Sequence, residues 1–249
     1  MPINGNLIDS YHRLSTRRKI VTRALAIISV LLIIIILLTY YGTQTGNFVV
    51  TIEGKKYQSL SLSDKEDRSD QTARLLAKAM RDCHDADYSY IPTDIEQGIG
   101  TKNDYKNYRY FAYSFYLINS GDIAVNYSMN INIVRAEKQL DSILRVMIIK
   151  DGEETIYAKA REDEGHQGEP EGVYIDEKGY AQTEEPLKYT VPFIEDASQT
   201  IISQINYDFA AGAYTKYTCV IWLDGWDKQE TDYMQGGAIQ TELVFKIIT

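Results

Sequence analysis

Few residues in this chain are of the types that carry out catalysis, and they are not spaced for it. The only histidines are His12, His84 and His166, and no HExxH pair is present for a helix-borne zinc site. Cys83 precedes His84 directly, and sequence neighbours point in different directions, so we do not expect a thiol–imidazole pair. No G-x-S-x-G elbow or glycine-rich phosphate loop occurs. The sequence indicates no enzyme and no cofactor. An envelope hydrolase assembled only in the fold stays as an alternative, and a cleft uniting His84 or His166 with carboxylates would favour it.

One acidic segment has the residue types of a calcium site. The stretch DGWDKQETD contains four carboxylates, those of Asp224, Asp227, Glu230 and Asp232. Calcium prefers such oxygen ligands in extracellular modules, but the spacing is not that of an EF-hand and Lys228 lies among the acids. We therefore favour a solvated connection between strands, with a weak calcium site as the alternative.

The cysteines and aromatic residues leave two further alternatives open. Cys83 and Cys219 are the only cysteines, so they either form one disulfide or remain two buried free thiols. The chain has 20 tyrosines against 6 phenylalanines, and tyrosine suits both sandwich faces and contact surfaces. Trp226 stands beside acids in the same segment and is the best candidate for an exposed aromatic contact, whereas Trp222 is expected in the core. A carbohydrate-binding module would need several such rings on one face.

An uncharged apolar run at residues 24–41 predicts a single transmembrane helix, because about 18 apolar residues suffice to cross the hydrocarbon core. The preceding tail, residues 1–23, carries five basic residues and one acid, and no Lys or Arg follows the run until Lys55. This asymmetry predicts a signal-anchor with the N-terminus inside and the rest outside at the cell membrane. Cleavage near residues 42–47, the predicted linker, would instead give a secreted protein.

The rest of the chain is acidic, since the whole carries a net charge of −9 although its tail is basic. An acidic domain does not attract nucleic acid or an anionic membrane surface. We therefore expect no nucleic-acid partner.

Residues 48–249 have the pattern of one antiparallel β-sandwich domain. We expect hairpins at 48–62, 108–133 and 143–160, then a short edge strand at 189–193. Longer strands are expected at 199–209, 213–224 and 238–248. Residues 125–133 alternate strictly between apolar and polar types, which predicts a strand buried on one face. A helix is predicted over 69–82 from its apolar spacing, and a helical turn over 137–142 with Leu140 inward.

Two blocks carry a resemblance to a known group of proteins. They are TCVIWLDGWDKQETDYMQGGAIQTELVFKI (218–247) and YFAYSFYLINSGDIAVNYSMNINI (110–133). They resemble signal-anchored surface proteins of Gram-positive bacteria and, distantly, the TasA/camelysin family of biofilm-matrix proteins. The resemblance implies a jelly-roll-like sandwich and assembly into fibres by strand donation. The metal and protease associations of that family attach to no residue here.

The expected function is therefore binding, adhesion or assembly of the matrix or envelope. Other surface proteins, further copies of this chain and cell-wall polysaccharide are the candidate partners. Residues 48–62 are the segment best placed to be exchanged, although we favour the interpretation that they close their own sheet.

Overall fold

The computed structural model describes residues 21–36, 48–53, 59–78, 80, 83–102, 108–160, 190–194, 199–225 and 232–248. The chain forms two compact units, Met1–Thr45 and Gly46–Thr249. In the first unit, residues 21–36 are helical. Within the described residues, no helix has both the length and the apolar character needed to cross a membrane. Residues 37–41 of the predicted span, the tail before residue 21 and the linker lie outside the described part, so the anchor stays a prediction.

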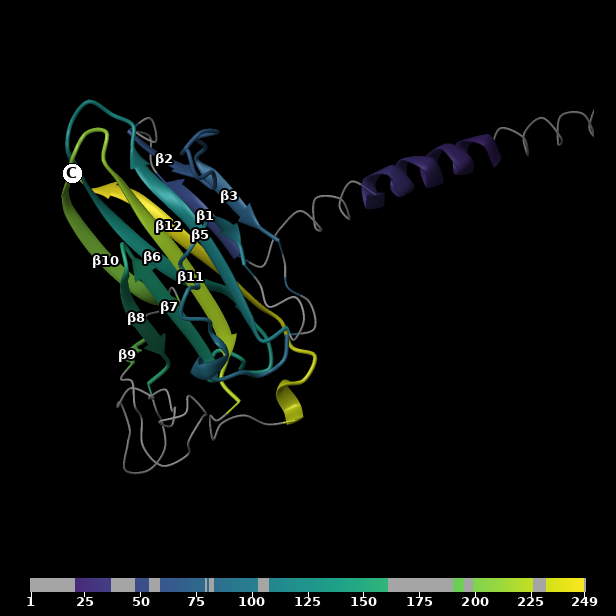
Figure 1. The fold of residues 1–249 in the computed structure, drawn as a ribbon. Coiled ribbons are helices and arrows are strands. Elements are labelled where there is room, and N and C mark those ends of the chain that lie inside the picture. The colour runs from purple at the N-terminus through teal and green to yellow at the C-terminus, as the bar shows by residue number, and fades with distance from the viewer. Residues whose placement is uncertain are drawn as a thin grey trace, which may run out of the picture. The chain divides into compact units, whose positions relative to one another are not determined.

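The second unit is mainly β and consists of two packed sheets (Figure 1). Sheet A contains, in spatial order, β10 (Thr200–Phe209), β6 (Val125–Ala136), β12 (Ile239–Ile248), β1 (Phe48–Glu53) and β3 (Arg74–Ala77). Sheet B contains β2 (Leu60–Ser63), β5 (Tyr110–Asn119), β11 (Tyr214–Leu223), β7 (Leu144–Lys150), β8 (Glu153–Ala158) and β9 (Val191–Pro192), with β4 (Gly100–Thr101) also paired to β5. Two 3-10 turns, η1 (Tyr88–Tyr90) and η2 (Asp232–Met234), are the helical elements of this described part.

The sheets are mixed, which corrects the purely antiparallel prediction. β1 pairs with β12 in parallel, and β8 pairs with β9 in parallel. Parallel neighbours cannot be joined by a tight turn and need a long connection. For β1 and β12 that connection is nearly the whole domain, because they are its first and last strands. Turn residues next to these two strands therefore could not predict that β1 and β12 run parallel.

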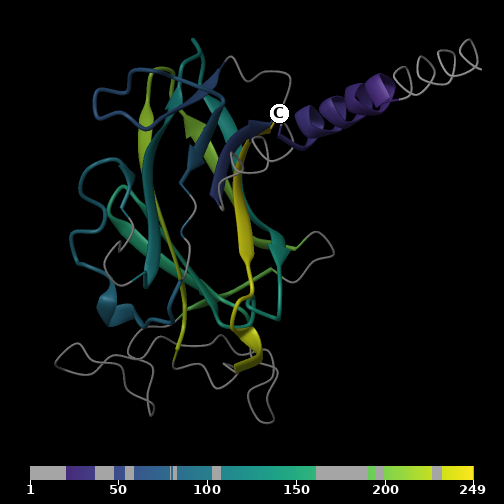
Figure 2. The same cartoon turned by 90° about the vertical axis from the view of Figure 1, so that its right-hand side faces the viewer.

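The main core lies between the sheets, and a second apolar cluster lies on the outer face of sheet B. Figure 2 shows the ribbon of the two sheets from a second side. In this second cluster Ala86, Ile91 and Ile95 pack on residues that point outward from β5, β7 and β11, such as Trp222. All ten residues of β5 are consequently buried.

β6 alternates between buried and half-buried positions from Met129 to Ile133, as predicted, because sheet A is buried mainly on its inner face. Val125, which is only half-buried, and Ser128, which is buried, depart from the predicted alternation.

Two of the three predicted hairpins are wrong because their strands lie in different sheets. β5 belongs to sheet B and β6 to sheet A, so their inward apolar residues meet across the core. The buried Asn119 fixes this crossing, since its amide nitrogen donates to the carbonyl oxygens of Ile123 and Phe209, both at 2.8 Å. β1 and β2 are separated in the same way.

The third hairpin, β7–β8, is confirmed. Asp151 and Gly152 both have positive φ, 48° and 88°, as a type I′ turn requires. The short edge strand near 189–193 is also confirmed as β9, at the end of sheet B.

The helix predicted over 69–82 is wrong, since this segment contains β3, which pairs with β1. Leu75 and Ala77 are buried there, while Arg74 and Leu76 are exposed. Positive φ at Asp70 (51°) also interrupts a right-handed helix near the predicted start. Pairing with a sheet edge therefore outweighs helix propensity, which contributes little for so short a segment.

The turn at 137–142 is not a right-handed helical turn, because Lys138 and Gln139 have positive φ of 54° and 59°. Leu140 is buried, as predicted.

Candidate functional site

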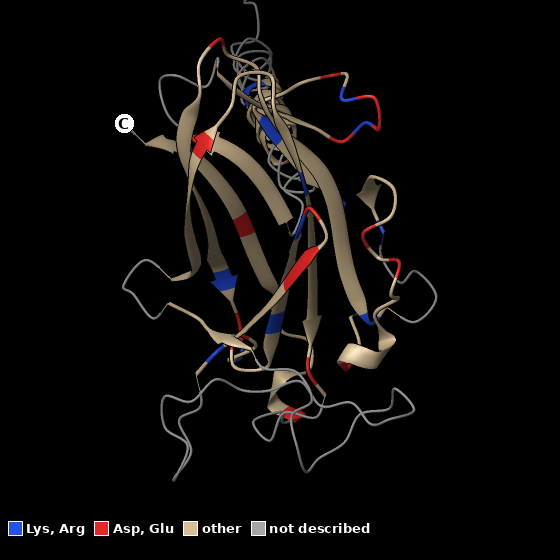
Figure 3. Ribbon diagram, turned by 60° about the vertical axis from the view of Figure 1, so that its left-hand side comes forward, with Lys and Arg blue, Asp and Glu red and all other residues tan. Residues whose placement is uncertain are grey.

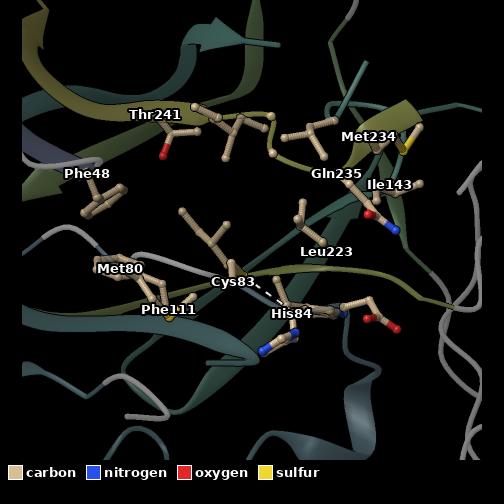
Figure 4. Close-up of a pocket in the computed structure, with 18 residues that line it drawn as sticks. Phe48, Met80, Cys83, His84, Phe111, Ile143, Leu223, Met234, Gln235 and Thr241 are labelled. Atoms are coloured by element: carbon tan, nitrogen blue, oxygen red, sulfur yellow. Dashed lines mark hydrogen bonds between the residues drawn. The ribbon is translucent and has the colours of Figure 1, made fainter. Parts of the chain in front are cut away.

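The candidate site is a cavity of about 890 Å³ at one end of the sandwich (Figure 4). Both sheets contribute inward-facing residues to its walls. Phe48, Ile239 and Thr241 come from sheet A, and Phe111, Ile221 and Leu223 come from sheet B. A volume of this size falls in the range of small-molecule sites, which are mostly apolar with a few placed polar groups.

A small cluster of Leu140, Ile143 and Met234 forms another wall of the cavity. The turn after η2 passes close to this cluster. A Cβ placed on Gly237 would lie 2.8 Å from Cδ1 of Leu140 and 3.1 Å from the carbonyl oxygen of Met234. The glycine therefore lets this turn pack tightly on Leu140, and any side chain at residue 237 would push it outward.

Cys83, His84, Asp85 and Gln235 are the exposed polar residues of the lining. Backbone hydrogen bonds hold the first three in place: His84 N–H donates to Tyr108 O, and Ala86 N–H donates to Leu223 O, both at 2.8 Å. Gly225 lies against this segment, and a Cβ there would collide with the carboxylate of Asp85. Polar groups thus border an otherwise apolar cavity.

The Cys83 thiol does not have the environment of an activated cysteine. The Sγ of Cys83 donates to the carbonyl oxygen of His84 at 3.5 Å, and not to the imidazole (Figure 4). Burial, followed by the negative charge of Asp85, raises the pKa of the Cys83 thiol to about 11. Reactive cysteines have lowered pKa values, so this group stays protonated at neutral pH.

The cavity does unite His84 with the carboxylate of Asp85, which is the arrangement expected of the hydrolase alternative. Within the described residues, however, no hydrogen bond joins the His84 imidazole to a nucleophile. His166 lies outside the described part of the chain. The enzyme alternative therefore has a carboxylate and a histidine in one place, without the nucleophile–base contact that defines such sites.

The two cysteines are free thiols, so the disulfide that the sequence left open as an alternative is not formed. Cys219 is fully buried in the core between the sheets, whereas Cys83 is exposed at the cavity. The alternative of two buried thiols is correct for Cys219 alone. Burial also raises the pKa of Cys219 far above its ordinary value.

The predicted calcium segment is only partly described. Asp224 is 3% exposed and its Oδ2 lies 3.3 Å from Nε of the equally buried Arg145, so this carboxylate serves an ion pair. Asp232 begins η2, and its Oδ1 accepts from the Gln235 amide. Asp227 and Glu230 lie outside the described residues. Among the residues that are described, no group of three or more His, Cys, Asp or Glu side chains could hold a metal.

The Arg145–Asp224 pair is the principal polar feature that sequence reasoning missed. Arg145 interrupts the apolar run ILRVMIIK, and a single charge inside such a strand was the available signal. A buried charge requires a partner of opposite sign, and Asp224 directly follows the adjacent strand β11. The pattern "one Arg in an apolar strand, one Asp ending another" could have predicted this contact.

The exposed tyrosines of the described part, which are Tyr90, Tyr108, Tyr207, Tyr214 and Tyr233, do not all lie together. Trp222 is buried as predicted, and Trp226 lies outside the described residues. Tyr207 and Tyr214 flank the β10–β11 connection at the start of β11. Tyr90 lies near the other end of β11, because Ala86 bridges to Asp224. The length of β11 therefore separates these exposed rings.

Comparison with known proteins gives no further guide to this site: no family model, curated protein or solved structure matches the chain. The geometry described above therefore supplies the functional argument.

Proposed function

We propose that this chain is a membrane-held surface protein of a bacterial envelope that acts by binding, and that its sandwich takes an apolar group into the end cavity. The size and apolar lining of the cavity carry this proposal. An amphipathic small molecule fits best, with its apolar body between Phe111, Leu223 and Ile239 and its polar end beside His84 and Gln235. Adhesion or envelope assembly would follow if the bound group belongs to a larger envelope component.

The protonated thiol of Cys83 supports binding over catalysis. A neutral thiol beside Met80 and Met234 adds to an adaptable, sulfur-rich lining. The side chains of this border could donate hydrogen bonds to a ligand without reacting with it.

Thermal unfolding of the full chain in lipid nanodiscs, titrated with a series of linear alkanols, tests the binding proposal. A ligand that binds only the folded state raises the unfolding temperature, and the rise continues to grow with the logarithm of the ligand concentration above the dissociation constant. Ile239→Trp should fill the cavity and abolish this rise. Gln240→Trp, on the opposite face of the same strand, is the matched control and should retain it. An equal rise in unfolding temperature for both variants would show that the alkanols act through the lipid, and it would contradict the proposal.

Exchange of β1 between copies is a second candidate, and it accords with the resemblance to biofilm-matrix proteins. β1 is the first strand after the predicted anchor, and it lies between β12 and β3 within its own sheet. Phe48 and Val50 are almost completely buried, so the sheet requires a strand at this position. A strand from another copy, presenting the same alternating side chains, would satisfy that requirement equally.

A disulfide cross-link can distinguish a β1 strand that comes from the same chain from one that comes from another copy. Val49 lies opposite Glu242 in the parallel register, so a chain with Val49→Cys, Glu242→Cys and Cys83→Ser should bridge on oxidation. Covalent ladders in cells would support exchange. Bridged monomers alone would contradict it and leave β1 as a fixed part of its own sandwich.

A further inference from the structure

Lys150 and Asn206 meet between the two sheets of the sandwich. The side-chain ammonium of Lys150, the last residue of β7 in sheet B, donates a hydrogen bond to Oδ1 of Asn206 in β10 of sheet A. The two residues are 56 positions apart in the chain. Figure 3 shows few charged residues along the strands. A lysine that reaches from one sheet to the other is therefore a distinctive feature of this sandwich.

The strand registers place this contact beside two core tyrosines. Lys150 lies opposite Tyr217 in the pairing of β7 with β11, and Asn206 lies opposite Tyr127 in the pairing of β10 with β6. Both tyrosines belong to the main core and are 1% exposed. Residues that lie directly opposite each other share one face of a sheet. The Lys150–Asn206 contact therefore lies next to the hydrogen bond that joins the two tyrosine hydroxyls.

Both members of the contact have an unmet requirement. Nδ2 of Asn206 is buried and has no hydrogen-bond partner among the described residues, and such an unpaired donor destabilises a fold. Lys150 is half-buried, and no described carboxylate forms an ion pair with it. A charge taken out of water normally needs a counter-charge. An amide bond between Nζ and Cγ would remove the unpaired donor and the unpaired charge together.

The contact also brings the reacting atoms together. A hydrogen bond to Oδ1 holds Nζ close to Cγ, the carbon bonded to that oxygen, and this replaces a bimolecular encounter by an intramolecular reaction. After the ammonium loses a proton to solvent, the neutral amine attacks Cγ. The Cγ–Nδ2 bond breaks, and the departing nitrogen takes a second proton from the amine. The products are one amide bond and one ammonia, without oxidation or reduction.

The tyrosine hydroxyls can assist this step. Burial raises the pKa of both Tyr127 and Tyr217, so both hydroxyls stay protonated at neutral pH. In a pair that shares one hydrogen bond, the accepting hydroxyl still has its own proton to donate. A donor beside the amide stabilises the negative charge that develops on its oxygen during the attack.

We propose that Lys150 and Asn206 become joined by an intramolecular amide bond, formed between Nζ and Cγ with release of ammonia, which ties β7 of sheet B to β10 of sheet A. The bond links positions that are far apart in the chain, so it restricts the unfolded state. This modification goes beyond the proposed binding function and is independent of the cavity and of β1.

Mass spectrometry of the full chain, purified in detergent, tests for the bond. The intact mass should be lower by about 17 Da, the mass of one ammonia, than that of the same chain without the bond. After digestion of the denatured chain with trypsin, the peptide that contains Lys150 should remain linked to the peptide that contains Asn206. A chain without this loss of mass, or with a loss that maps to other residues, would overturn the proposal.

Lys150→Arg is the decisive variant, because a guanidinium keeps a donor for Oδ1 but does not supply the amine. It should show neither the loss of mass nor the linked peptides, and Asn206→Ala should behave in the same way. The unfolding temperature should fall by roughly 10 °C, because the unfolded chain is no longer restricted.

Lys159→Arg is the matched control. The ammonium of Lys159 pairs with the carboxylate of Asp141, and both side chains are more than a quarter exposed. This variant should keep the loss of mass, the linked peptides and the unfolding temperature of the unsubstituted chain. Linked peptides that persist in Lys150→Arg, or equal changes in the two arginine variants, would contradict the proposed bond.

Discussion

The outer faces of the two sheets differ in what covers them. On sheet B, residues 86–95 form a lid under which Arg145, Met147 and Trp222 are each at most 2% exposed. On sheet A, Val134 and Ile205 are at least half exposed. A strand buried on both faces has a continuous apolar sequence, whereas a strand buried on one face alternates. The comparison teaches that sheet B is covered on both faces, whereas the outer face of sheet A is exposed at β6 and β10 within the described residues.

The largest effect should come from breaking the ion pair under the lid. Asp224→Ala leaves the guanidinium of Arg145 buried without this carboxylate, which we expect to cost about 4 kcal/mol. Chemical denaturation of the full chain in detergent measures the loss. Asp141→Ala removes a pair with Lys159 that is more than a quarter exposed, and should cost less than about 1 kcal/mol. Similar losses for the two variants would show that the lid does not exclude water.

Cavity formation should distinguish the same two faces. Met147→Ala, on the covered face, should cost about 3 kcal/mol, since the deleted atoms leave a void beneath the lid. Val134→Ala, on the open face, should change stability by less than about 0.5 kcal/mol. The measurement is again the free energy of unfolding. If the valine variant lost as much as the methionine variant, sheet A would be covered as well.

A smaller effect is expected where the two sheets face each other. The hydroxyls of Tyr127 in β6 and Tyr217 in β11 are 2.8 Å apart in the core. Tyr217→Phe leaves the other hydroxyl buried without this partner and should cost about 1.5 kcal/mol. The double variant with Tyr127→Phe removes both groups and should lose less than the sum of the single variants. Strict additivity, seen in the unfolding free energies, would rule out a direct contact.

The two cysteines should differ clearly in their reactivity toward alkylating reagents. At neutral pH both thiols are protonated, so their ionisation should hardly change the free energy of unfolding. Cys219 in the core of the sandwich should resist alkylation in the folded chain. Cys83 should react with iodoacetamide only as pH approaches 11, because burial raises its pKa to about 11. Mass spectrometry of the alkylated full chain, from pH 7 to 11.5, measures both rates. Half-maximal reaction of Cys83 near pH 9 would contradict the raised pKa of its thiol.

The same raised pKa has a consequence for stability, and its sign follows from proton binding. Above pH 9 the unfolded chain loses the thiol proton, while the folded chain keeps it up to about pH 11. The contribution of Cys83 is therefore fully present below pH 9 and is lost as pH rises toward 11.

The sequence predicted most strands, because apolar residues such as Tyr127 and Met129 recur at every second position where one face of a strand is buried. It failed at two of three hairpins, since a turn such as 119–122 serves equally to pair strands in one sheet and to cross between sheets. The helix prediction at 69–82 failed for a related reason: the pairing of β3 with β1 involves residues more than 20 positions apart. The cavity is formed by several segments that are distant in the sequence, so the sequence did not predict it. Of its polar residues, only Cys83 and His84 drew attention, because they are neighbours in the sequence.

The parallel pairing of β1 with β12 also sets the mechanical behaviour of the domain. β1 is matched to β12 at six positions and to β3 at four. A pull on the N-terminal end of β1, directed along the strand, strains these hydrogen bonds together in shear, whereas a peeling load would break them one after another. Since the pairs bear the load together, the domain should resist tension from the predicted anchor while β1 stays in its sheet.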